Sequence, residues 1–91
     1  VDLKKLLVIL KRRGVKRLLV EGGGEINWSM LSSGFVDEII LTLAPRIVGG
    51  RDAITFVEGK GFEKIDNGVK LKLEKTRKID NELILSYKII N

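Results

Sequence analysis

The residues best suited to contacting a ligand are Glu21 and the three glycines that follow it, Gly22, Gly23 and Gly24. They come directly after an apolar run at 18–20 and directly before a segment with helical periodicity, the layout of a βα turn. The free N–H groups at the start of the helix in such a turn suit a phosphate or pyrophosphate. Glycines let a ligand approach the backbone closely. The alternative is that these glycines only make a tight connection between strand and helix.

The spacing differs from two familiar phosphate-binding motifs. In the dinucleotide pattern G-x-G-x-x-G the third glycine would fall at position 27, which is Asn27, and no acidic residue ends a following strand about 20 residues further on. The Walker pattern fails as well, because no Gly-Lys-Ser/Thr follows. The turn therefore predicts an anion site without identifying the anion.

Glu21 is an unusual residue for the end of a predicted buried strand, because a buried carboxylate loses hydration unless a donor satisfies it. One interpretation is that Glu21 accepts hydrogen bonds from a polar ligand. The other is that it caps the next helix or pairs with a nearby lysine. Glu25 and Asn27 fall in the first helical turn, where their types favour compensation of the helix dipole over catalysis.

The sequence has no cysteine and no histidine among its 91 residues. These absences exclude thiolate metal sites, cysteine nucleophiles, the commonest zinc sites and serine-histidine triads. Proton transfer is left to carboxylates, lysines and Tyr87, so we expect no metal and identify no catalytic side chain. The composition, 44% hydrophobic and 32% charged, is that of a single folded domain.

The net charge of +5 raises the question of a nucleic-acid partner. Lys and Arg alternate with Glu and Asp, however, as on a solvated surface, and this pattern is also typical of thermophilic proteins. The aromatic residues do not interleave with the basic ones as a base-stacking platform requires, which disfavours nucleic acid. No apolar run is long enough to span a membrane, and the first residues lack a secretory layout, so we expect a cytoplasmic protein.

Periodicity predicts the elements that position the turn. Leucines at a helical spacing predict a helix that Asp2 caps and Gly14 ends, and a second helix is expected over 25–33. Apolar runs at 18–20 and 37–44 predict two buried strands, with the second helix between them. Strand, helix and strand make a βαβ unit with a parallel strand pair. The glycine-containing segment 46–64 is expected to be a loop with a short strand at 54–57.

The last part of the chain predicts an antiparallel hairpin. Apolar and polar residues alternate over 69–74, and 83–90 is apolar at most positions, with a turn at Asp80-Asn81 between the two segments. The predicted fold class is therefore α/β, with a mixed sheet in which a βαβ unit is followed by an antiparallel hairpin.

The segment from Leu18 to Gly50 resembles a known family. It combines L-L-V-E-G-G-G at 18–24 with V-D-E at 36–38, A-P at 44–45 and G-G at 49–50. This combination resembles the C-terminal half of the reductase domain of riboflavin biosynthesis, which has a dihydrofolate-reductase-like fold. The segments from Val69 to Ile90 are similar to the closing hairpin of that family, so the resemblance covers nearly the whole chain.

The resemblance implies the NADPH-dependent reduction of a phosphoribosylamino-pyrimidine to the ribitylamino compound, with hydride delivered to the former C1′ of the sugar. Such chemistry needs mainly positioning, which agrees with a sequence that lacks histidine and cysteine. By the same resemblance, Glu21 contacts the pyrimidine substrate. The residues implied to bind NADPH around its pyrophosphate are Gly22, Gly23, Gly24, Glu25, Ile26 and Asn27.

The family's domain is longer than this chain, so residues 1–91 are expected to form one partial domain, its C-terminal half. An incomplete sheet exposes edges and apolar surface, and the family resemblance implies a homodimer. This half does not distinguish a diaminopyrimidinone substrate from an aminouracil substrate. The alternatives are a non-catalytic interaction fragment, a small basic nucleic-acid module, and a related reductase of the same fold that acts on another small molecule.

Overall fold

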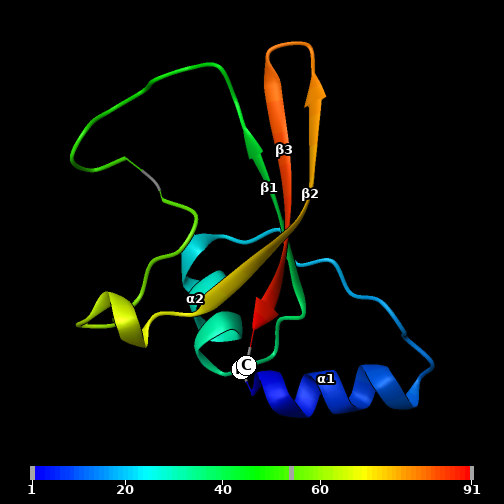
Figure 1. Ribbon diagram of the computed structural model, residues 1–91. Helices are drawn as coiled ribbons and strands as arrows, with labels where there is room; N and C mark the ends of the chain where they lie inside the picture. The colour runs from blue at the N-terminus through cyan, green and yellow to red at the C-terminus, as the bar shows by residue number, and fades with distance from the viewer. Residues whose placement is uncertain (1, 54, 91) are drawn as a thin grey trace.

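The computed structural model describes residues 2–53 and 55–90 of the chain. Its elements, in order, are α1 (Leu3–Arg12), α2 (Gly24–Ser32), β1 (Glu38–Leu43), the short 3-10 helix η1 (Ile65–Asn67), β2 (Lys70–Ile79) and β3 (Glu82–Ile90). Figure 1 shows the strands as one twisted sheet with α2 beside one end of it. The α/β class is confirmed. Neither helix in this described part combines the length and the apolar character needed to cross a membrane.

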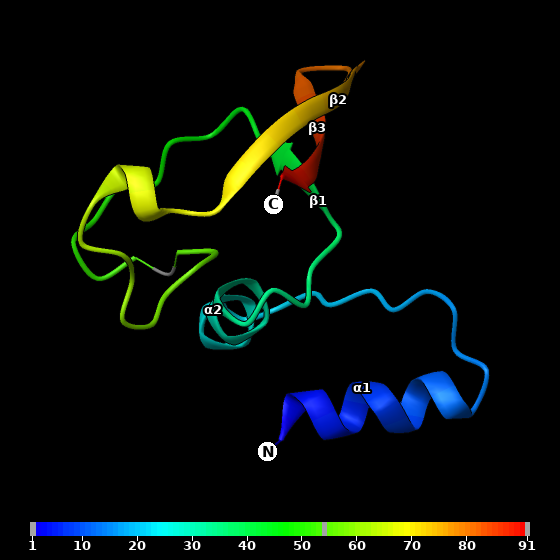
Figure 2. The same ribbon diagram turned by 60° about the horizontal axis from the view of Figure 1, so that its bottom comes forward.

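Helix α1 begins and ends where its sequence predicts. The Asp2 carboxylate accepts a hydrogen bond of 3.1 Å from the Lys5 N–H, which satisfies one of the unpaired donors at the helix start. At the other end Gly14 adopts a φ of 87°, the left-handed conformation that glycine takes most readily. Both ribbon views place α1 apart from the sheet (Figures 1 and 2), and the apolar side chains Leu6 and Val8 on it remain exposed.

The sheet has three strands in the order β1-β3-β2, and both neighbouring pairs are antiparallel. The central strand β3 places Leu85 opposite Leu41 of β1 and Tyr87 opposite Leu73 of β2. The predicted hairpin between β2 and β3 is confirmed, and Asp80 in its turn has a φ of 52°. The hairpin register therefore sets the apolar face of the whole sheet.

A bulge in β2 changes which of its side chains face the apolar side. Leu73 pairs with Tyr87 and Lys75 pairs with Ser86, so Glu74 is an extra residue on this strand. Beyond the bulge, Thr76 lies opposite Leu85. Without the extra residue, Lys75 would take that place on the apolar face. The bulge thus moves Lys75 to the opposite face of the sheet, across from Ser86.

The predicted strand at 18–20 is not present among the described residues, and with it the predicted parallel pair of the βαβ unit is not confirmed. Residues 15–23 belong to no helix or strand, and Leu18 and Leu19 are exposed. An apolar run becomes a strand only when a neighbour completes its backbone hydrogen bonds. The described strands pair only with one another, so the run at 18–20 has no such neighbour. The short strand expected at 54–57 is also wrong for residues 55–57, while Ile54 lies outside the described residues.

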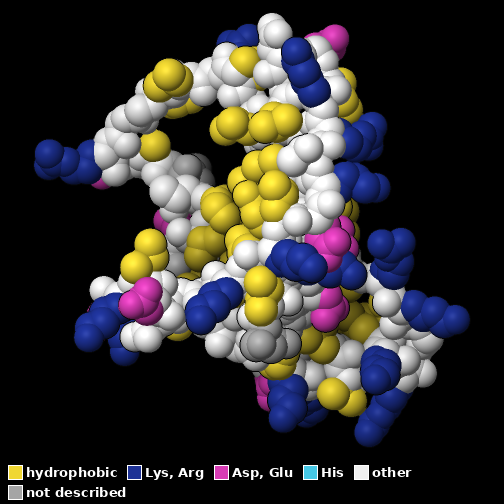
Figure 3. All heavy atoms as spheres, viewed as in Figure 1, with side chains coloured by type: hydrophobic (Ala, Val, Ile, Leu, Met, Phe, Trp, Pro, Cys, Tyr) yellow, Lys and Arg dark blue, Asp and Glu magenta, His cyan; other side chains and the backbone are white. Residues whose placement is uncertain are grey.

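The described chain buries little apolar surface. Among the described residues, Met30 on α2 is the only hydrophobic residue whose side chain is buried. The accessible surface is 8317 Å², whereas a compact monomer of this mass would expose about 5,300 Å². Hydrophobic side chains lie open over the sheet and the long loop before β2 (Figure 3). A large apolar area is therefore left for contacts outside the described chain.

Candidate functional site

The turn between the segment 15–21 and α2 has an unusual backbone. Gly22 adopts a φ of 99°, which side-chain-bearing residues rarely take, and the Gly22–Gly23 peptide bond is cis. Gly23 is the N-cap of α2, with φ −72° and ψ −160°. The glycine at 22 is therefore required by the conformation of the turn, whereas the backbone of Gly23 is compatible with other residues.

The first N–H groups of α2 have no partner within the described residues. The Asn27 N–H is the first to bond back along the helix, at 3.0 Å to the Gly23 carbonyl, and no side chain caps the helix. Within the described part of the chain, the N–H groups of Gly24, Glu25 and Ile26 at the helix start therefore have no protein acceptor. Unpaired N–H groups together with the positive end of the helix dipole make this end attractive to an anion.

The turn is open to solvent on one side. Gly23 is exposed, and a Cβ atom added there would meet no atom within 4 Å. The side chains of Glu25 and Ile26 are exposed as well, while Asn27 is half-buried. Solvent-side access to Gly23 gives a ligand room to approach the backbone of the turn.

Glu21 lies in a different environment from the one that the sequence predicts. Its side chain is exposed, because the segment before it is not a buried strand in the described chain. The prediction that the Glu21 carboxylate is buried at the end of a strand is therefore wrong within the described residues. Glu21 does not cap α2 either, since that helix has no side-chain cap, whereas pairing with a nearby lysine stays a prediction. What remains is an exposed carboxylate immediately beside the open glycine turn.

The other side of the turn is covered by a loop that the sequence does not single out. Gly24 is buried, and a Cβ atom added to it would lie 2.9 Å from the Thr55 carbonyl oxygen and 2.6 Å from Glu58 Cγ. The Glu58 N–H donates to the Gly24 carbonyl at 3.0 Å, and Asn27 Nδ2 donates to the Phe56 carbonyl at 2.6 Å. We call this arrangement of residues 55–58 on residues 24–27 the loop–helix contact.

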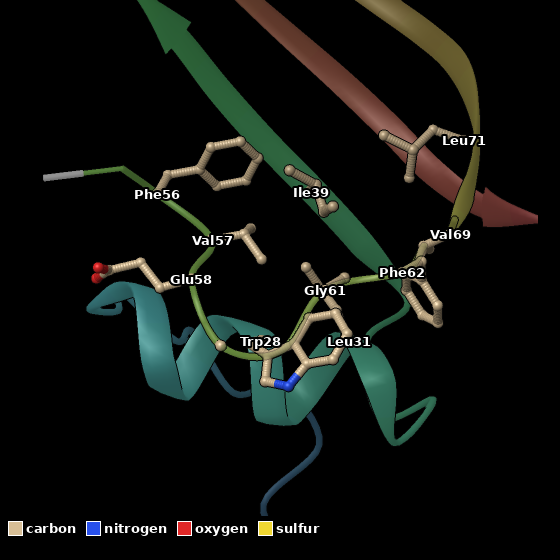
Figure 4. A pocket seen from close by; sticks show the side chains of 11 residues that line it. Trp28, Leu31, Ile39, Phe56, Val57, Glu58, Gly61, Phe62, Val69 and Leu71 are labelled. Carbon is tan, nitrogen blue, oxygen red and sulfur yellow. The ribbon is translucent and has the colours of Figure 1, made fainter. Parts of the chain in front are cut away.

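An apolar cavity lies behind this contact, between α2, the sheet and the loop. Its volume is about 400 Å³, and Figure 4 shows Trp28 and Leu31 of α2 facing Ile39 of β1 across it. The rings of Trp28 and Phe62 meet edge to face with their centroids 5.1 Å apart. The Glu58 carboxylate is turned away from the Trp28 ring, toward the start of α2 (Figure 4). The cavity is therefore apolar packing space, and the polar groups gather at the helix start.

The sequence of the chain matches a known protein family. The model of the family described as RibD C-terminal domain matches residues 1–85. The chain belongs to the RibD C-terminal domain family. The sequence-based resemblance to the riboflavin biosynthesis reductases is thereby confirmed.

Individual curated proteins also match nearly the whole chain. A 2,5-diamino-6-ribosylamino-4(3H)-pyrimidinone 5′-phosphate reductase of Methanothermobacter thermautotrophicus is 43% identical over 89 residues, covering 98% of this chain and 41% of the relative. The enzyme of the same name from Aquifex aeolicus is 44% identical over 91 residues, covering 100% and 41%. The chain thus spans less than half the length of these curated relatives.

A solved RibD structure supports the same assignment. Acinetobacter baumannii RibD superposes with a TM-score of 0.86 at 25% sequence identity, over 99% of this chain and 25% of that one. The arrangement of two helices and a three-stranded antiparallel sheet therefore corresponds to part of a larger protein of the RibD C-terminal domain family.

Proposed function

We propose that this chain is part of an NADPH-dependent reductase that converts a phosphoribosylamino-pyrimidine to the ribitylamino-pyrimidine phosphate in riboflavin biosynthesis. The observation that carries the proposal is the open glycine turn before α2, with unpaired N–H groups, in a chain of the RibD C-terminal domain family. The names of the two reductase relatives supply the substrate class. The complete domain has a dihydrofolate-reductase-like fold in this proposal, and the run at 18–20 gains its neighbouring strands there.

The proposed residue roles combine the family resemblance with the geometry of the turn. The backbone of residues 22–26 receives the pyrophosphate of NADPH, because its unpaired N–H groups and open glycine fit two adjacent phosphates. Asn27 completes this cofactor segment, and Glu21, exposed beside it, accepts hydrogen bonds from the pyrimidine. NADPH supplies the hydride that reduces C1′ of the sugar. The chain contributes by holding the cofactor and the substrate close together and correctly oriented for hydride transfer.

A homodimer, which the family resemblance implies, is the working form in this proposal, and the large exposed surface leaves room for it. The described chain exposes about 3,000 Å² more than a compact monomer of its mass. Obligate interfaces bury 2,000 to 5,000 Å² in total, so both the rest of the domain and a second copy fit on this surface. A cytoplasmic location belongs to the same proposal.

Calorimetric titration with NADPH, with NADH in parallel, tests this function on the protein expressed from its complete gene. Wild-type protein should bind NADPH saturably, and Gly23→Asp should abolish binding because it places a carboxylate where the pyrophosphate lies. Ser33→Ala is the matched control, since Ser33 lies exposed at the opposite end of α2. Equal binding by wild type and Gly23→Asp would contradict the placement of the cofactor, and no binding by folded wild type would contradict the function.

A further inference from the structure

The loop–helix contact joins two parts of the chain that lie far apart in sequence. Asn27 and Phe56 are 29 residues apart, yet the Asn27 side chain donates to the Phe56 carbonyl at 2.6 Å. The backbone bond from Glu58 to Gly24 lies beside it. The loop is also braced internally, because the Thr55 hydroxyl donates to the Val57 carbonyl at 3.1 Å. An ordered segment of loop therefore rests directly on the first turn of α2.

The Asn27 amide also lies close to Gly22 of the glycine turn. A Cβ atom added at Gly22 would lie 3.2 Å from Asn27 Nδ2 and 3.7 Å from Asn27 Oδ1. One half-buried side chain thus lies beside Gly22 of the turn and is bonded to the loop that covers Gly24. The Asn27 N–H donates to the Gly23 carbonyl, and its Nδ2 group donates to the Phe56 carbonyl. Both donor groups of Asn27 therefore bind the turn and the loop, in addition to any contact with the cofactor.

We propose that Asn27 is a positioning residue, whose side-chain amide fastens the loop 55–58 to the start of α2 and holds Gly22 and Gly23 in the shape that receives the cofactor's pyrophosphate. This inference rests on the proposed function and assigns to Asn27 a role beyond direct contact with the cofactor. Loss of the amide leaves the Phe56 carbonyl without its donor and removes the neighbour of Gly22. The turn then samples more conformations, and cofactor binding must order it again.

The effect should appear in cofactor affinity and much less in turnover. A typical net hydrogen bond corresponds to about a fivefold change in an equilibrium constant. Asn27→Leu, which keeps the approximate shape of the side chain without a donor, should raise the Kd and KM for NADPH about fivefold. Its kcat at saturating NADPH should stay within about twofold of wild type, because saturation restores the ordered turn. Asn27→Gln retains the amide and should recover part of the lost affinity.

Calorimetry and steady-state kinetics on the protein expressed from its complete gene test this inference, with Ser33→Ala as the control. A raised Kd in Asn27→Leu, eased in Asn27→Gln, supports the positioning role. A Kd for Asn27→Leu within twofold of wild type, or a loss confined to kcat, overturns it while the proposed function stands. Failure of folded wild type to bind NADPH refutes the function itself. If Asn27→Leu does not fold, Asn27→Ala, which also lacks a side-chain donor, gives the same comparison.

Discussion

Alanine in place of Gly24 should destabilise the protein, although the change adds a single methyl group. The new Cβ would lie 2.9 Å from the Thr55 carbonyl oxygen and 2.6 Å from Glu58 Cγ, and the first of these is backbone that cannot rotate away. Overpacking of this kind costs about 1 to 3 kcal/mol. Displacement of the loop also weakens the bond from the Glu58 N–H to the Gly24 carbonyl, which contributes about 1 kcal/mol. The expected loss in the free energy of unfolding is therefore about 2 to 4 kcal/mol.

The neighbouring glycine provides an internal comparison, because Gly23→Ala should have the opposite profile. Its Cβ would meet nothing within 4 Å, and its φ of −72° suits alanine. Stability should therefore stay within about 0.5 kcal/mol of wild type, as the loss of freedom in the unfolded chain offsets a weaker N-cap. The methyl group would nevertheless stand in the proposed phosphate position, so NADPH affinity should fall about tenfold, equivalent to about 1.4 kcal/mol.

Urea unfolding of both variants, together with calorimetric NADPH titration, measures the two effects separately. Wild-type stability in Gly24→Ala would refute the close packing of the loop on α2. Unchanged NADPH affinity in Gly23→Ala would show that the cofactor does not lie against the open side of the turn.

Three further substitutions test the packing around this site. Gly59→Ala should lower the free energy of unfolding by about 2 to 4 kcal/mol and change the tryptophan fluorescence. The reason is that Gly59 has a φ of 83° and an added Cβ would overlap the Trp28 ring. Native fluorescence and stability would contradict this. Met30→Ala should lower the free energy of unfolding, measured in urea, by about 2 to 5 kcal/mol, since the Met30 side chain is only 6% exposed. A loss below about 1 kcal/mol would show that Met30 is not part of the hydrophobic core. Asp80→Gly should stabilise the hairpin by about 0.5 to 1 kcal/mol in thermal unfolding, because φ is 52° there, and a lower midpoint would count against that turn.

Local sequence patterns predict most of the elements. The helical spacing of leucines with Asp2 in front gives α1, and the alternation on either side of Asp80 gives the β2–β3 hairpin. These signals are sufficient because the forces that set them act within a few residues. The site turn is predicted for a similar reason, since three successive glycines interrupt regular structure and permit a tight turn before the helix.

The run at 18–20 shows the limit of such patterns. Its composition is that of a buried strand, yet no strand of the described chain pairs with it. Composition reports what a segment can become, whereas pairing depends on which neighbours are present. The bulge at Glu74 is hidden in the same way, because one inserted residue changes the register without changing the local composition.

The loop–helix contact is the part of the site that sequence reasoning missed. It depends on the backbone N–H of Glu58 and the backbone carbonyl of Phe56, which have no signature in the sequence. Asn27 therefore appears in the sequence as a helix-start residue and in the structure as a tie to a loop 29 residues away. The only signal available beforehand was Gly24 itself, whose missing side chain is explained by the loop that covers it.

The most direct test of the central claim is an NADPH oxidation assay on the protein expressed from its complete gene. The assay supplies 2,5-diamino-6-ribosylamino-4(3H)-pyrimidinone 5′-phosphate in one arm and 5-amino-6-(5-phosphoribosylamino)uracil in the other. The account predicts that NADPH is consumed in step with formation of the ribitylamino product in one arm, and that Gly23→Asp abolishes this consumption. Absence of substrate-dependent NADPH oxidation in both arms, with folded wild-type protein, would contradict it.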